Sequence, residues 1–88
     1  MKHAGPDALD KLEPLLERLR KRGALTERKR GLFYRGSRAF LHFHEHGEEL
    51  FADMRVGDDF KRFPATKSRE QAALLKALDA ALSGSARP

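Results

Sequence analysis

The chain has 88 residues, a formal net charge of +5 and no cysteine. The lack of thiols excludes disulfides, thiolate zinc sites and cysteine nucleophiles, and no apolar run is long enough to span a membrane. A chain of this length buries only about 60% of its unfolded surface, so we expect a single domain over residues 1–88 without a spacious buried active site. The first residues lack the apolar core of a signal peptide, which favours a cytoplasmic protein.

The first element that the sequence predicts is a helix, preceded by a disordered tail at residues 1–6. Asp7 can cap this helix, and leucines at helical spacing between Leu9 and Leu19 form one apolar stripe. Pro14 interrupts the pattern, because proline lacks the backbone N–H that an interior helical hydrogen bond needs. Two alternatives follow: the helix kinks at Pro14, or the main helix begins there and ends at Arg22.

Four antiparallel strands in meander order are predicted next, because short segments of strand-forming residues follow one another with glycine-containing turns between them. They cover residues 24–29, 32–35, 38–45 and 48–56. A two-residue turn at His46 and Gly47 would set the register of the last pair, with His44 opposite Glu49. The aliphatic residues of this hairpin then face the core, and the alternate residues face outward.

The end of the chain is predicted to return to a helix. Residues 57–59 end the fourth strand, and residues 60–64 are expected to form a crossover. Ser68 and Gln71 have the spacing of a capping box, which predicts a helix from Arg69 to Leu82 and a disordered tail at 84–88. The predicted fold is therefore α+β, a two-layer sandwich in which a meander of about four strands is flanked by N- and C-terminal helices.

The outward face of the predicted sheet suggests an interaction surface. It carries Phe33, Phe40 and Phe51 together with His42 and His44. Exposed phenylalanines are costly in water when they cluster, and contiguous apolar patches mark contact surfaces. The first hypothesis is therefore a non-enzymatic module that binds a protein partner, or forms a homodimer, through this face.

A basic segment supports a second hypothesis. Residues 18–30 hold seven basic side chains against one acid, Glu27, and such a run can bind the phosphates of a nucleic acid. The candidate residues are Arg20, Lys21, Arg22, Arg28, Lys29 and Arg30. A helix end and an edge strand also explain these charges, and the sequence contains no recognisable nucleic-acid-binding motif.

A third hypothesis is a divalent-metal site on the hairpin. His42 and His44 project from one face of a strand, and the predicted register places Glu49 across from them, with Asp53 as a further candidate. Imidazole nitrogens and a carboxylate are ligands for zinc and related ions, although histidines are also common on exposed strands. The same Glu49 is expected to raise the pKa of His44. No nucleophile, oxyanion site or glycine-rich phosphate loop is apparent, so no catalytic residue and no obligatory cofactor are predicted.

Several stretches resemble a family of small uncharacterised bacterial proteins. They are Phe33-Tyr34, the Ala-Phe-Leu-His-Phe-His-Glu run at 39–45, Leu-Phe-Ala-Asp at 50–53 and Phe-Lys-Arg-Phe-Pro at 60–64. This resemblance covers about residues 20–80 and implies a domain without an assigned activity. The order of elements is also similar to that of frataxin-like and YjbR-like domains, which place two helices on an antiparallel sheet. The YjbR-like plan implies possible DNA contact, whereas the mixed charges of the first helix do not imply the iron handling of frataxins.

Overall fold

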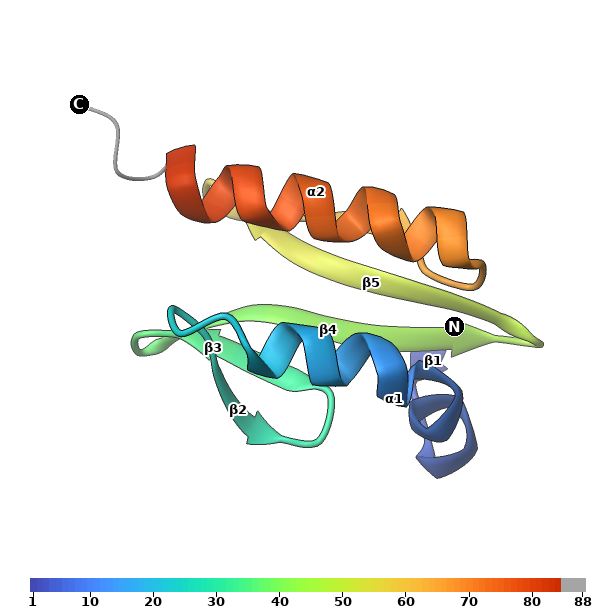
Figure 1. Ribbon diagram of the computed structural model, residues 1–88. Coiled ribbons are helices and arrows are strands. Elements are labelled where there is room, and N and C mark those ends of the chain that lie inside the picture. The colour runs from blue at the N-terminus through green and yellow to red at the C-terminus, as the bar shows by residue number, and fades with distance from the viewer. Residues whose placement is uncertain (85–88) are drawn as a thin grey trace.

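The computed structural model describes residues 1–84, and Figure 1 shows the arrangement of its elements. The helices are α1 (Pro6–Arg20) and α2 (Ser68–Gly84), and the strands are β1 (Lys2–His3), β2 (Thr26–Lys29), β3 (Leu32–Arg35), β4 (Arg38–His46), β5 (Glu49–Val56) and β6 (Asp59–Pro64). The predicted class is confirmed: the fold is α+β, with an antiparallel sheet and a helix towards each end of the chain. The predicted number of about four strands is wrong, because the sheet has six.

Helix α1 continues through Pro14. Gly5 is its N-cap and Pro6 occupies the first turn, where a proline loses no helical hydrogen bond, so the predicted cap at Asp7 and the predicted start at Pro14 are both wrong. One face of the helix buries a stripe of leucines (Leu12, Leu15, Leu16 and Leu19). Each buried leucine stabilises the fold by about 1.5–3 kcal/mol, so this stripe outweighs the cost of about 3 kcal/mol for an interior proline.

The five longer strands follow the order β2-β3-β4-β5-β6, and the short β1 pairs with β4. Because β5 follows one edge of β4, β1 must lie on the other edge, beyond the end of β3. The N–H of Ala4 extends this pairing by donating to the carbonyl of Phe43 at 3.1 Å. Residues 1–6 are therefore not the predicted disordered tail. Of the tail predicted at 84–88, Gly84 ends α2 and residues 85–88 lie outside the described part of the chain.

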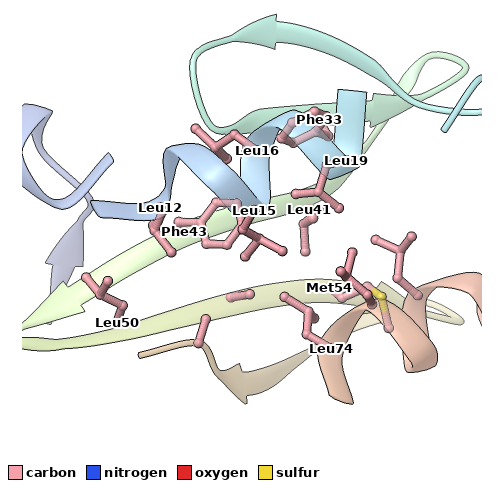
Figure 2. Close-up of a cluster of buried hydrophobic side chains, with 14 of the residues drawn as sticks. Leu12, Leu15, Leu16, Leu19, Phe33, Leu41, Phe43, Leu50, Met54 and Leu74 are labelled. Carbon is pink, nitrogen blue, oxygen red and sulfur yellow. The ribbon is translucent and has the colours of Figure 1, made fainter. Parts of the chain in front are cut away.

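Both helices pack on the same face of the sheet, α1 over β3 and β4 and α2 over β5 and β6 (Figure 1). Leucines of both helices meet the aliphatic residues of β4 and β5, such as Leu41 and Met54 (Figure 2). This confirms that the aliphatic residues in the middle of the hairpin face the core, whereas Val56 at its end is 50% exposed. The opposite face of the sheet, which no described helix covers, is here called the open face; on β4 and β5 it carries His42, His44 and Asp53.

The turn between β4 and β5 consists of Gly47 and Glu48, not of His46 and Gly47. Gly47 has a φ of 60°, and glycine at the first central position is what a type II′ turn needs. The predicted turn would instead have required a positive φ at His46, which side chains with a Cβ avoid. The true register shifts the pairing by two residues, so that His44 lies opposite Phe51 and His42 opposite Asp53. A shift of two residues leaves the two faces of the hairpin unchanged.

Phe33 and Phe40 are not on the outward face, which corrects the prediction. They are 0% and 5% exposed and belong to the core, where Figure 2 shows Phe33 among the leucines of α1. The cause is a β-bulge between β3 and β4: Phe33 pairs with Leu41 and Tyr34 with Ala39, so Phe40 is the extra residue. A bulge breaks the alternation of side chains, which brings Phe40 to the helix side.

Residues 59–64 form β6 rather than the predicted crossover. This strand pairs with β5 along its whole length and is the edge of the sheet. Its alternation places Phe63 against the core and Phe60 on the open face, where it is 40% exposed.

Helix α2 begins without the predicted capping box of Ser68 and Gln71. Instead, Oε1 of Glu70 accepts hydrogen bonds from the N–H groups of Thr66 and Lys67, at 3.0 and 2.9 Å. A glutamate in the first turn also interacts favourably with the positive end of the helix dipole. Among the described helices, neither has the length and apolar character needed to cross a membrane.

Candidate metal centre

The pairing of β4 with β5 brings together two histidines and a carboxylate on the open face. Nε2 of His44 lies 3.2 Å from Oδ2 of Asp53, and Nε2 of His42 lies 3.8 Å from the same oxygen. The three residues each offer a donor atom, and these atoms all lie within 4.8 Å of one another. We call His42, His44 and Asp53 the His-His-Asp cluster.

Neighbouring rings enclose the cluster on two sides. Strand β1 places His3 over His44, with ring centroids 4.6 Å apart, and β6 places Phe60 over His42 at 4.9 Å. As a result, the side chains of His42 and His44 are only 23% and 14% exposed, although no described helix covers this face. The cluster is therefore half-buried and its rings are held by their neighbours.

Asp53 is the one buried charged residue among those described. Arg62, directly opposite on β6, donates from Nε to Oδ1 and from a terminal nitrogen to Oδ2, both at 2.8 Å. These charge-assisted hydrogen bonds hold the pKa of Asp53 below its ordinary value. The carboxylate is thus ionised at neutral pH and fixed in orientation.

Burial lowers the pKa of both His42 and His44. The charge of Asp53 acts in the opposite direction, but desolvation prevails, with help from the nearby Arg62 and the other histidines. Both imidazoles are therefore neutral at neutral pH, which is the state in which a ring nitrogen can bind a cation. Nε2 of His42 is also buried and has no hydrogen-bond partner among the described residues.

The predicted role of Glu49 is wrong. Glu49 pairs with His46 at the end of the hairpin, so it neither joins the metal ligands nor raises the pKa of His44. Asp53 takes its place. The alternation of the strand had already put Asp53 on the correct face, and only the two-residue error in register hid its position opposite His42.

The predicted interaction surface is reduced by the corrections above. Phe51, His42 and His44 lie on the open face, with Phe51 paired with His44, whereas Phe33 and Phe40 are buried in the core. Binding of a protein partner or a second copy through the remaining residues stays a prediction.

Most of the arginines proposed for nucleic-acid binding are engaged within the molecule. Arg20, Arg22 and Arg30 form ion pairs with carboxylates. Arg20 contacts three of them, those of Glu13, Glu17 and Glu27. Arg28 lies over the ring of Tyr34, 4.5 Å from its centroid. Lys21 and Lys29 are exposed and make no ion pair with the described residues. Nucleic-acid binding by this segment stays a prediction, with fewer unpaired charges to support it.

Comparison with known protein families, with curated proteins and with solved structures finds no match to this chain. The resemblance to small bacterial proteins and to YjbR-like or frataxin-like domains therefore also stays a prediction.

Proposed function

We propose that this chain binds a divalent transition-metal ion through His42, His44 and Asp53. The observation that carries the proposal is the convergence of three ligand atoms of suitable chemistry within 4.8 Å, on adjacent strands of one sheet. Zinc sites with three protein ligands leave a further position open for water or another molecule. Two imidazoles and one carboxylate also form the ligand set of mononuclear iron(II) sites, so the preferred ion is part of the test.

The two distances from the histidines to Asp53 can be compared with those around such an ion. Ligands about 2.0–2.1 Å from a tetrahedral zinc lie roughly 3.3 Å from one another. The 3.2 Å between His44 and Asp53 already matches this value, and the 3.8 Å between His42 and Asp53 exceeds it by about half an ångström. Binding therefore requires the His42 ring to move towards Asp53 by about half an ångström, and the donor atoms of the two histidines lie no more than 4.8 Å apart.

The competing account is a polar network without a metal, in which Arg62 and His44 alone contact the carboxylate of Asp53. Two features favour the metal. Nε2 of His42 has no hydrogen-bond partner among the described residues, and the side chain of Arg62 is 47% exposed, so it can move away from an incoming ion.

The test is a metal titration of protein purified without an affinity tag and freed of metal with a chelator. We expect one Co²⁺ or Zn²⁺ per chain, detected by visible absorption for cobalt and by calorimetry for zinc. His42→Ala should weaken zinc binding at least about tenfold, because it removes a ligand. His46→Ala is the matched control: this histidine is exposed at the end of the same strand and lies outside the cluster.

Circular dichroism of both variants separates a lost ligand from a lost fold. The proposal fails if the wild-type chain binds no ion in stoichiometric amount. It also fails if the folded His42→Ala and His46→Ala variants lose the same affinity.

A further inference from the structure

A second candidate site lies at one end of the sheet and shares no residue with the His-His-Asp cluster. It is a pocket of about 440 Å³ at the end of the sheet where the β3–β4 and β5–β6 turns approach the C-terminal part of α2. Its lining consists of Arg35, Arg38, Phe40, Arg55, Val56, Gly57 and Ala81. Pockets that bind small molecules have volumes of about 300–1,000 Å³, so this one is large enough for a small ligand.

The pocket has an apolar wall. Phe40 reaches it because of the β-bulge, and Ala81 contributes from α2. Val56, at the end of β5, is one of the few large hydrophobic side chains that the described residues leave exposed. This wall can therefore bury the apolar part of a ligand. Removing the side chain of Val56 from water would make the free energy of binding more favourable.

The rest of the lining is positively charged. It includes three arginines, and no acidic residue of the described chain lines the pocket. Nε of Arg55 donates to the carbonyl of Ala39 at 2.8 Å, which orients the guanidinium without neutralising it. Arg38 is exposed and forms no ion pair with the described residues. By contrast, Arg20, Arg22, Arg30 and Arg62 all bind carboxylates elsewhere in the fold.

A structural role accounts for one of the three arginines. Arg35 donates to the carbonyl of Leu82 at 3.4 Å, at the negative end of the dipole of α2, and α2 has no basic residue of its own in its last turn. Arg55 also has structural contacts, since it donates to Ala39 and its guanidinium lies over the ring of Phe60, 4.6 Å from the centroid, but neither contact neutralises its charge. Arg38 makes no ion pair with the described residues.

We propose that this pocket binds a small organic anion whose phosphate or carboxylate group pairs with the arginines and whose apolar body packs against Phe40 and Val56. Guanidinium groups bind both anionic groups through charge-assisted hydrogen bonds. The pocket shares no residue with the His-His-Asp cluster, so this proposal is independent of metal binding.

The test is an amide NMR titration of the full chain, without a tag and in the presence of a chelator. Phenyl phosphate and benzoate are the two probes, and the tighter of them identifies the preferred anionic group. We expect the amide signals of Arg38, Val56 and Gly57 to shift. Inorganic phosphate has the anionic group but no apolar ring, and benzyl alcohol has the ring but no charge. Each should bind at least about fivefold more weakly than the better probe.

Two variants with the same change of net charge locate the site. Arg38→Gln should weaken binding of the better probe at least about fivefold, because it removes a charge from the pocket. Arg69→Gln alters an exposed arginine in the first turn of α2, at the other end of that helix, and should change the affinity less than about twofold.

The proposal is wrong if the two variants lose affinity equally, since a general attraction to a basic chain would then explain the binding. It is also wrong if the shifts map outside the pocket, or if benzyl alcohol binds as tightly as the anionic probes.

Discussion

Asp53 faces two histidines and an arginine, and a bound cation would compete with that arginine for the same carboxylate. Arg62 occupies both oxygens of Asp53 with hydrogen bonds of 2.8 Å. A divalent ion at Oδ2 would repel the guanidinium. Because the side chain of Arg62 is 47% exposed, solvent screens part of its charge, whereas the carboxylate of Asp53 is buried.

Arg62→Gln is therefore expected to raise the affinity for zinc by up to about fivefold, since it removes a positive charge next to the ion. The same substitution should lower the free energy of unfolding of the metal-free chain, because it leaves the buried carboxylate of Asp53 without its two charge-assisted hydrogen bonds. Calorimetry and urea denaturation measure the two effects, with Arg69→Gln as a control for net charge. Weaker zinc binding in Arg62→Gln alone would show that Arg62 positions Asp53 for the ion and does not compete with it.

Among the strands, β4 and β5 show what local pattern can predict. With the exception of Phe40, their alternation correctly indicates which residues face the helices, and it places His42, His44 and Asp53 on one face. It cannot predict the bulge at Phe40, because the bulge arises from the pairing of β3 with β4 and not from the pattern of either strand. The same limit explains why the sequence pattern places Phe33 and Phe40 on the outward face, whereas the fold buries both.

The two strands that the sequence failed to predict depend on their partners. Strand β6 is mostly exposed, carries charged residues and ends in Pro64, so its own pattern is weak and its pairing with β5 defines it. Strand β1 has two residues and exists because β4 extends beyond the end of β3. For this reason His3, which lies over the candidate site, was missed as a neighbour of His44.

The assignment of residues to the two faces of the sheet predicts that alanine substitutions at two phenylalanines will lower the free energy of unfolding by different amounts. Phe33→Ala should lower the free energy of unfolding by about 3–5 kcal/mol, because the ring is fully buried in the core. Phe60→Ala, on the open face, should cost about 1 kcal/mol or less. Urea denaturation measures both values. A loss in Phe60→Ala as large as that in Phe33→Ala would mean that the open face is packed as tightly as the core.

At the scale of the whole molecule, the half-buried histidines of the open face link stability to pH. Burial lowers the pKa of His42 and His44 from the ordinary value of 6.5, so just below that pH the unfolded chain binds more protons than the folded chain. The free energy of unfolding must then rise with pH across this range. Asp53 acts in a different window: its stabilising contribution is present above its ordinary pKa of 3.8 and is lost as pH falls through the lower, folded-state pKa.

We therefore expect the free energy of unfolding of the metal-free chain to decrease between about pH 7.5 and about pH 5.5, where histidines titrate and carboxylates do not. The double variant His42→Gln/His44→Gln should show a smaller decrease, because glutamine does not titrate. Urea denaturation at several pH values, with a chelator present, measures both slopes. An unchanged slope in the double variant would assign the pH dependence to other groups. A wild-type stability that instead rises as pH falls would mean that attraction to Asp53 outweighs burial, so that the cluster would hold charged imidazoles and bind a cation poorly.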